Sequence, residues 1–413
     1  MRQVLFHLPL EIAGVPFFGF GWMLLAWALG SLVFLGWLHR HNALAEGLQQ
    51  YGLLLLVIGA VIAYGMPLME GELHGAPIRG YGVMLMLGVV SGVSLALYEA
   101  RREGIDPDAI LSLTFWMFVG GISGARLFFV VQYRETFYRE THWETMIEML
   151  KVTEGGLVVY GSLIGGAIAG WLCIRKLKLP WRKTADLLAP GMVLGLALGR
   201  LGCFLNGCCY GGVCDSAWSV SFPPKSPPYQ HQLQSGEFYG FRLTEDEGLR
   251  VGFVRPGGLA DQAKIQVGDR ILAINGYPAK SLKEAGRWLA SGRQLHLEIL
   301  DRETDAVLSV TPPARSLPVH PTQVYSSISA AFLCLLLWAY YPYRRRFGEV
   351  FLWMLTLYSI VRFLLEAIRT DEGGQINTGL TISQLVSVGI MLLAIAEWVM
   401  LLRLRVIDVG TRA

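Results

Sequence analysis

An arginine, an asparagine and three cysteines close a long apolar run at residues 199–211, which read Gly-Arg-Leu-Gly-Cys-Phe-Leu-Asn-Gly-Cys-Cys-Tyr-Gly. The guanidinium of Arg200 is therefore expected at membrane depth. A charge there costs about 2.5 kcal/mol or more unless it meets a partner, a cavity or a ligand. Arginine binds phosphate and carboxylate groups through paired hydrogen bonds, and glycine lets such groups approach the backbone. The segment predicts an anion site, with an arginine paired to a neighbouring helix as the alternative.

Four cysteines, Cys203, Cys208, Cys209 and Cys214, lie together at the end of the same run. Their order does not match the common spacings of zinc-binding cysteines, so a metal site is the less favoured interpretation and no metal is predicted. An oxidising side of the membrane permits disulfides, and a structural disulfide is favoured here.

The composition is that of a membrane protein. Of 413 residues, 53% are hydrophobic and only 16% are charged, and the mean hydropathy is +0.44. These values exclude an ordinary soluble domain. The net charge of +3 is too small to indicate nucleic-acid binding. Apolar runs long enough to cross a hydrocarbon core predict nine transmembrane helices. They lie near residues 17–38, 51–68, 80–98, 110–131, 157–174, 187–206, 324–342, 348–368 and 382–402.

The loops between these runs differ in their basic residues. Lysine and arginine are more frequent after the first, third, fifth and seventh spans and at the C-terminus than on the opposite side. Because cytoplasmic loops carry this excess, the C-terminus is expected in the cytoplasm. The N-terminus and the long segment between the sixth and seventh spans are expected outside.

That long segment contains a stretch with the composition of a soluble domain, at residues 236–314, here called the insert. Asn275-Gly276 is a strong hairpin turn signal after a short apolar strand. The segments Pro-Gly-Gly-Leu-Ala and Gly-Asp-Arg-Ile-Leu-Ala-Ile-Asn-Gly resemble a PDZ domain of the bacterial envelope-protease type. PDZ domains bind an extended peptide as an added strand. The candidate carboxylate loop, Tyr239-Gly240-Phe241, is a weak match, and the alternative is a spacer without a peptide ligand.

Residues 14–24 align with residues 75–85, which indicates a duplicated membrane-entry element. Only the second copy contains Arg79 and Tyr81, so that copy is the candidate for a site. The predicted fold is an α-helical polytopic membrane protein with an inserted extracytoplasmic α+β domain. Its predicted parts are an extra N-terminal transmembrane pair, a membrane core in two pieces, and the insert. They cover residues 1–74, then 75–235 and 315–413, and finally 236–314.

Several polar segments occur in a characteristic order along the apolar runs. They are Arg79-Gly80-Tyr81-Gly82, Arg126 after a glycine-rich turn, Tyr160-Gly161, the 199–211 segment, His320-Pro321-Thr322-Gln323-Val324-Tyr325, and Arg362 with Glu366. This order resembles the prolipoprotein diacylglyceryl transferase family. The resemblance implies a multi-pass enzyme of the bacterial inner membrane that needs no cofactor. It would move the diacylglyceryl group of phosphatidylglycerol to the lipobox cysteine thiol of secreted prolipoprotein precursors, forming a thioether and releasing glycerol phosphate.

The resemblance also implies roles for single residues. Arg200 and Arg362 would bind the lipid phosphate and stabilise the charge that develops on it. Tyr81 and Asn206 would orient the headgroup, and Gly211 would let the backbone approach. Arg79, Arg126, Tyr325 and Glu366 complete the expected substrate-binding set.

Two positions depart from the family pattern. Tyr160 stands where the family usually has a histidine proposed to activate the acceptor thiol, and Cys203 stands where an asparagine is common. A tyrosine with an ordinary pKa of about 10 is a poor general base at neutral pH. Either the base is dispensable here, or another group or the thiolate fraction of the substrate suffices. Tyr160 is nevertheless expected to line the site.

Two other functions were weighed. The first is a non-catalytic member of the same fold that binds lipid or lipoprotein through a PDZ module. The second is an intramembrane protease, which the sequence disfavours because no His-Glu-x-x-His occurs. Gly121-Ile122-Ser123-Gly124 mimics a serine-protease motif, but no histidine base stands on another span. Packing of small residues between helices explains this segment better.

Overall fold

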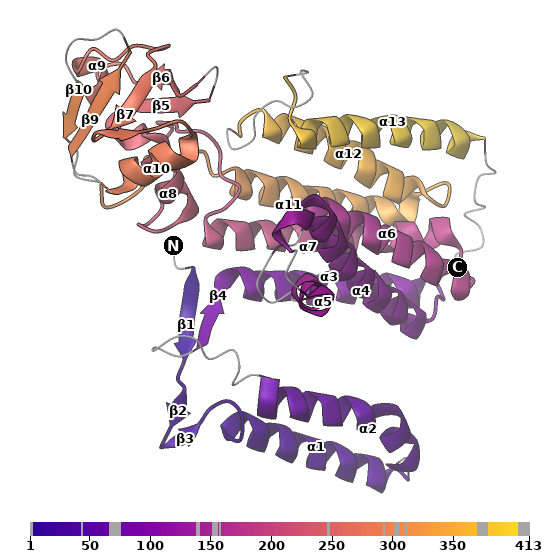
Figure 1. Cartoon of the computed structure of the whole chain (residues 1–413). Helices are drawn as coiled ribbons and strands as arrows, with labels where there is room; N and C mark the ends of the chain where they lie inside the picture. Colours follow the sequence, from indigo (N-terminus) through magenta and orange to yellow (C-terminus); the bar gives the residue numbers. More distant parts are fainter. Residues whose placement is uncertain are drawn as a thin grey trace. The chain divides into compact units, whose positions relative to one another are not determined.

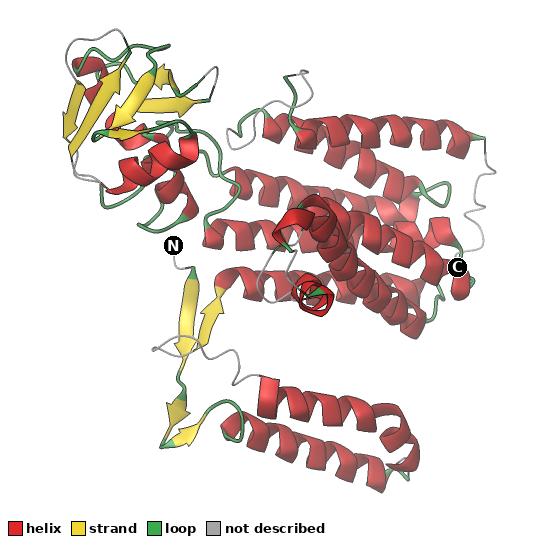
Figure 2. Ribbon diagram, in the orientation of Figure 1, coloured by secondary structure: helices red, strands yellow, loops and turns green. Residues whose placement is uncertain are grey.

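The computed structural model describes residues 3–42, 44–65, 76–137, 141–150, 156, 158–245, 248–291, 294–300, 306–309, 313–369 and 379–403 (Figures 1 and 2). The chain divides into two compact units, Met1–Val83 and Met84–Ala413.

The first unit is a helical hairpin with short strands. Helices α1 (Trp22–Arg40) and α2 (Leu44–Ala60) pack together, and α2 continues into a π-helical turn, Val61–Gly65. Strand β1 (Val4–Leu8) pairs with β4 (Ala76–Arg79), and β2 (Glu11–Ile12) pairs with β3 (Val15–Pro16). The two copies of the repeat therefore each lead from a short strand into a long helix.

The second unit holds the remaining long helices. They are α3 (Gly80–Arg102), which begins at the end of the first unit, α4 (Pro107–Gln132), α6 (Val159–Lys176), α7 (Trp181–Asn206), α11 (Thr322–Tyr340), α12 (Glu349–Glu366) and α13 (Ile382–Leu402). A shorter helix, α5 (His142–Leu150), follows α4.

Each of the nine predicted spans coincides with a helix in the described part of the chain. Six of these helices, α1, α3, α4, α7, α11 and α13, are long and apolar enough to cross a membrane. The protein is thus a multi-pass helical membrane protein. Helices α2, α6 and α12 are shorter or more charged, so the number nine stays a prediction.

Helices α4 and α6 meet at their glycines. A Cβ atom on Gly124 would lie 2.4 Å from the carbonyl oxygen of Gly161, so any side chain there would force the helices apart. Small residues allow such close approach between membrane helices. The Gly121–Gly124 segment therefore serves helix packing, and this packing fixes the position of the neighbouring Tyr160.

Helix α7 lies against α11 and α12. Ala189, Val193 and Ala197 of α7 are buried against Leu333 and Leu337 of α11. A polar contact accompanies this packing, because Ser327 Oγ donates to the Ala197 carbonyl at 2.8 Å.

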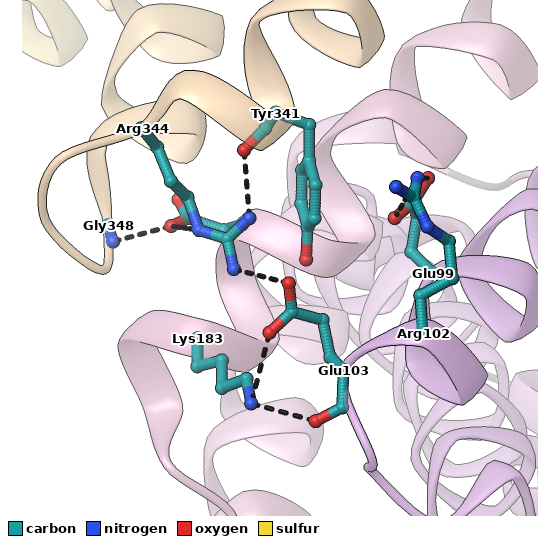
Figure 3. Close-up of polar contacts among 8 residues, drawn as sticks. Glu99, Arg102, Glu103, Lys183, Tyr341, Arg344 and Gly348 are labelled. Atoms are coloured by element: carbon teal, nitrogen blue, oxygen red, sulfur yellow. Dashed lines mark hydrogen bonds and ion pairs between the residues drawn. The ribbon is translucent and has the colours of Figure 1, made fainter. Parts of the chain in front are cut away.

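The N-terminal end of α7 carries a buried polar network (Figure 3). Arg344 Nη2 lies 2.7 Å from Glu103 Oε1, and Lys183 Nζ lies 3.1 Å from Glu103 Oε2. Asp186 accepts the backbone N–H groups of Gly348 at 2.7 Å and Phe351 at 2.9 Å. Asp186 thereby accepts hydrogen bonds from backbone N–H groups at the start of α12 and connects that helix to α7.

The insert folds as an α+β domain with its own core. Its elements are β5 (Phe241–Thr244), β6 (Arg250–Val254), α9 (Leu259–Gln262), β7 (Ile271–Ile274), β8 (Tyr277–Pro278), α10 (Leu282–Ser291), β9 (Gln294–Ile299) and β10 (Ala306–Ser309). One sheet has the order β10-β9-β7-β8 and the other pairs β5 with β6. Leu295, Leu297 and Ile299 alternate inward from β9 onto a shared core. The predicted hairpin turn at Asn275-Gly276 joins β7 to β8.

The segments that flank the insert contact each other. Phe222 N–H donates to Ser316 Oγ at 2.8 Å, and Ser316 N–H donates to the Phe222 carbonyl at 2.9 Å. Helix α8 (Pro227–Ser235) adds a second tie, because the Gln232 amide bonds both the N–H and the carbonyl of Leu317.

Candidate active site

The site begins where α7 ends. Gly207 adopts a left-handed conformation with φ of 83°, and the N–H groups of Gly207 and Cys208 both donate to the Cys203 carbonyl, at 2.8 and 3.2 Å. The bond from Cys208 is the 6→1 bond of a Schellman motif and the bond from Gly207 is the 5→1 bond of the simpler left-handed cap, and such turns bring the side chains on either side together. Most such motifs pair apolar side chains, whereas here the pair is Cys203 and Cys208.

The segment after the turn is held by the start of α11. Thr322 Oγ1 donates to the Cys209 carbonyl and Gln323 Nε2 donates to the Cys208 carbonyl, both at 2.7 Å. Cys209 itself has a positive φ of 61°, which is uncommon for a residue other than glycine. Two segments far apart in the sequence thus fix the backbone that carries the thiols.

Gly211 lies in the same junction. Its N–H donates to the His320 carbonyl at 2.9 Å, and the N–H of Gly212 donates to the Ile368 carbonyl at 3.2 Å. A Cβ on Gly211 would come within 2.8 Å of His320 Cβ and 2.9 Å of Thr322 Cγ2. Packing within the chain therefore requires this glycine, and its role at the substrate stays a prediction.

A second cluster joins α12, α13 and α6. Arg362 Nη1 lies 2.6 Å from Glu366 Oε2, an ion pair between residues one helical turn apart. Arg362 Nη2 donates to Ser383 Oγ at 2.8 Å, and the Tyr160 hydroxyl lies 3.5 Å from the same Oγ. Arg362 and Tyr160, both predicted from the sequence, are brought together through Ser383. Ser383 was missed, because a serine in the first turn of a helix is a common capping feature.

Glu366 is shared by two arginines. Arg369 Nη1 lies 3.3 Å from the Oε2 atom that Arg362 also contacts. Glu366 is only 1% exposed, and its Oε1 atom is buried without a hydrogen-bond partner in the described residues. One carboxylate therefore offsets two cations and keeps one oxygen free.

Arg200 lies half-buried in the last turns of α7. It makes no hydrogen bond or ion pair with any residue that the structure describes. Hydrogen bonds with the Cys203 and Cys208 thiols, and then the charges of Arg200 and Arg369, lower the pKa of the Cys209 thiol below its usual range. The charges of Arg200 and Arg369 therefore both stabilise the thiolate form of Cys209. Arg369 is also connected to Arg362, because both arginines contact Glu366.

The thiols form a cluster of their own. The Sγ atoms of Cys203, Cys208 and Cys209 all lie within 4.8 Å of one another. All three are free, as is Cys214, whose Sγ lies 3.4 Å from Ser216 Oγ. The predicted disulfide is therefore absent from this structure, in which the turn gathers three separate thiols.

Arg126 is a buried cation with internal partners. Its Nε and Nη2 atoms donate to the carbonyls of Met149 and Glu148, both at 2.9 Å, at the end of α5. Its guanidinium carbon also lies 5.5 Å from the centre of the Phe129 ring and 5.3 Å from that of Phe137. These contacts anchor α5 to α4, and a contact with substrate stays a prediction.

The other predicted residues lie at or near the ends of helices and strands. The Tyr325 hydroxyl lies 3.4 Å from His320 Nδ1 in the first turn of α11. Asn206 is the last residue of α7, and its side chain hydrogen-bonds the Cys208 thiol. Arg79 and Tyr81 belong to the first compact unit, at the end of β4 and the start of α3, and their roles stay predictions.

The described cavities lie elsewhere. One of about 280 Å³ is lined by the C-terminal end of α6, including Cys173 and Lys176, whereas Tyr160 stands at the N-terminal end of that helix. A smaller one of about 180 Å³ lies at the start of α7 and α12. The shared lipid cavity expected around Arg200 and Arg362 stays a prediction.

The comparison with protein families decides the assignment. A family model described as prolipoprotein diacylglyceryl transferase matches residues 71–400, well over half of the chain. The chain belongs to this family. It is 35% identical over 427 residues to the phosphatidylglycerol–prolipoprotein diacylglyceryl transferase of Rhodopirellula baltica, covering 94% of this chain and 86% of the relative.

Two further transferases of the family match less of the chain and at lower identity. The second phosphatidylglycerol–prolipoprotein diacylglyceryl transferase of Clostridium perfringens is 25% identical over 331 residues, which cover 79% of this chain and 92% of that protein. The transferase of Gloeobacter violaceus is 31% identical over 157 residues, which cover 38% of this chain and 57% of that protein.

Proposed function

We propose that this protein transfers the diacylglyceryl group of phosphatidylglycerol to the lipobox cysteine thiol of prolipoproteins, forming a thioether and releasing glycerol phosphate. The observation that carries the proposal is Arg200. Its half-buried guanidinium has no ion-pair partner in the described residues and lies near the end of α7, where its charge acts on the Cys209 thiol. A cation left unpaired in a membrane body is suited to a phosphate ligand.

The product defines which bond breaks. A thioether forms only if the sulfur bonds to a glycerol carbon, so the bond cut is the one between that carbon and the phosphate oxygen. The electron pair of this bond stays with the glycerol phosphate, which gains negative charge as it leaves. The donors of Arg200 have no partner among the described residues and can receive that charge, which is the interaction that accelerates such a step.

Arg362 would act as an oriented second cation. Its Nη1 pairs with Glu366 at 2.6 Å and its Nη2 donates to Ser383 at 2.8 Å, so its fork is held before a ligand arrives. Glu366 Oε1, buried without a partner in the described region, is available to accept a hydrogen bond from a headgroup hydroxyl. Such preorganised donors and acceptors cost little reorganisation during reaction.

The insert is proposed to be a PDZ-like domain outside the cytoplasm that holds the precursor. Gly240 in its candidate carboxylate loop has φ of 86° and accepts the Arg255 N–H at 2.8 Å. Among the described strands β5 pairs with β6 alone, and a sheet edge of this kind can take an extended peptide. Under this proposal the protein lies in the bacterial inner membrane with its C-terminus in the cytoplasm. The excess of basic residues in the loops on that side supports this orientation.

The test uses the purified full-length protein with phosphatidylglycerol vesicles and a lipobox peptide, and mass spectrometry follows the diacylglyceryl thioether. Product formation that is lost in Arg200→Lys supports the proposal, since lysine lacks the paired donors of arginine. Binding of lipid and peptide without any thioether would favour the non-catalytic alternative.

The role of the insert is tested separately. Replacing residues 236–314 with a short Gly/Ser linker should raise KM for the precursor and leave the lipid step intact, because Phe222 and Ser316 already meet. An unchanged KM would make the insert a spacer or a site for another envelope protein.

A further inference from the structure

The three thiols at the end of α7 have the geometry of a metal site. Their Sγ atoms lie within 4.8 Å of one another. Zinc–sulfur bonds of about 2.3 Å in a tetrahedral site put neighbouring sulfurs about 3.8 Å apart. Each Sγ therefore needs to move by less than about 1 Å, which a small rotation about the Cα–Cβ bond supplies.

The backbone that carries the thiols is fixed by contacts that do not involve the thiol groups. The turn at Gly207 holds Cys203 beside Cys208. Thr322 and Gln323 hold the carbonyls of Cys209 and Cys208. This arrangement does not follow the usual sequence spacings of zinc ligands, because a helix end rather than a short loop brings the ligands together.

The surroundings suit a site of this charge. Three thiolates and one divalent zinc ion carry a net charge of −1, and the cations Arg200 and Arg369 lie near Cys209. The Asn206 side chain hydrogen-bonds the Cys208 sulfur. Groups that hydrogen-bond a ligand sulfur orient it and tune the metal.

We propose that Cys203, Cys208 and Cys209 bind a zinc ion whose fourth position takes the acceptor cysteine thiol. Catalytic zinc sites have three protein ligands and one open position, and a thiol bound to zinc loses its proton. The inference rests on the proposed function, because the thiol it activates is that of the lipobox cysteine. It supplies the activation that Tyr160, as a poor general base, does not.

The reaction breaks two bonds, the S–H bond of the acceptor and the C–O bond of the lipid, and forms one C–S bond. The acceptor thiol releases its proton to water as its sulfur binds zinc. The sulfur then forms a bond to the glycerol carbon of the lipid, and the bond from that carbon to the phosphate oxygen breaks. The electron pair leaves on glycerol phosphate, beside Arg200. The thioether product binds zinc weakly, since it is neutral, and can depart.

Cobalt(II) reports such a site directly, because cobalt–thiolate bonds give charge-transfer absorption that zinc lacks. The reduced full-length protein in detergent should develop this absorption up to one equivalent of cobalt(II). Cys203→Ser, Cys208→Ser and Cys209→Ser should each weaken cobalt(II) affinity by at least about tenfold. Cys214→Ser is the matched control, because its Sγ contacts Ser216 outside the cluster, and it should bind cobalt(II) unchanged. Size-exclusion chromatography checks that each variant is folded.

The acceptor then tests the fourth position. A lipobox peptide should shift the cobalt(II) spectrum, whereas the same peptide with serine in place of its cysteine should not. A protein that forms thioether product while binding no cobalt(II) or zinc, or while its Cys203 and Cys208 are joined in a disulfide, overturns the zinc site and leaves the proposed function standing. A spectrum that responds to the cysteine peptide without any thioether from phosphatidylglycerol supports the metal site and overturns the proposed function instead.

Discussion

The two ends of α7 differ in how the charges around them are paired. At its N-terminal end, basic and acidic side chains contact one another. At its C-terminal end, the ion pairs of the described residues join two arginines to one glutamate, and Arg200 takes part in none of them. In the first network Lys183 and Arg344 contact Glu103, and Arg344 Nε also lies 3.6 Å from Asp186 (Figure 3). The helix has 26 residues, about 39 Å at 1.5 Å per residue. The two regions therefore lie a membrane thickness apart on one rigid element.

The difference separates structural charges from functional ones. Arg344 and Asp186 have fully buried side chains, and every charge in their network has an opposite charge beside it. Buried charges are tolerated when they are paired and hydrogen-bonded. At the other end, Glu366 is the one acidic residue that pairs with these arginines in the described part of the chain, and it cannot neutralise Arg362, Arg369 and Arg200 together. An anionic lipid headgroup would neutralise this surplus positive charge.

The largest expected effect is on Arg200. Arg200→Lys should lower kcat for thioether formation by about 10²–10³-fold, the usual cost of removing one donor to a developing charge. The melting temperature should change little, because Arg200 has no ion pair to lose in the described structure. Turnover within threefold of the parent protein would show that the unpaired cation is not the phosphate ligand.

The opposite end should show the reverse pattern. Arg344→Ala leaves Asp186 buried without its cation and Glu103 with Lys183 as its one remaining described cation, and it should cost about 3–5 kcal/mol of stability. Turnover per folded molecule should stay near that of the parent protein. Thermal unfolding in detergent measures the first effect, and a transfer assay on the folded fraction measures the second. The neighbouring Arg345 is exposed, so Arg345→Ala is the matched control and should leave both values unchanged.

Low pH should destabilise the network at the N-terminal end of α7. Burial raises the pKa of Glu103, but its contacts with Arg344 and Lys183 outweigh that effect and hold the pKa below the ordinary 4.5. A depressed pKa contributes stability above 4.5 that is lost as the pH falls through the folded-state value. The melting temperature should therefore drop below pH 4.5 by less in Glu103→Gln than in the parent protein. Equal drops would mean that other carboxylates control acid unfolding.

Much of the fold could be predicted because its signals are local. Apolar runs marked the helices, and Asn275-Gly276 marked a hairpin. Contacts between distant segments left no such signal. The bond from Ser383 to Arg362 depends on how α13 packs beside α12, and the thiol cluster depends on where α7 stops. The order of the cysteines disfavoured a metal site, because the turn that gathers Cys203, Cys208 and Cys209 was not visible in their spacing.

Ser383 tests whether the second cluster is a working part of the site. Ser383→Ala removes the hydrogen bond to Arg362 at 2.8 Å and the contact with Tyr160 at 3.5 Å. Arg362 keeps its ion pair with Glu366, so its orientation is loosened rather than lost. A hydrogen bond to a charged group is worth about 1.5–3 kcal/mol, and we expect kcat to fall by about tenfold. An unchanged kcat with an unchanged KM for lipid would reduce the cluster to a packing contact.

The smallest effect is expected from Tyr160. Tyr160→Phe keeps the ring beside Gly161 and removes only the hydroxyl, whose described partner is Ser383 at 3.5 Å, a distance that makes a weak hydrogen bond. If the acceptor thiol is activated elsewhere, kcat should fall by no more than about threefold, and the dependence of kcat on pH should keep its shape. A loss of a hundredfold, with the rising limb of the pH profile displaced, would instead make this hydroxyl the group that handles the thiol proton. In that case Tyr160 would replace the family's histidine in function as well as in position, and the zinc site would lose its purpose.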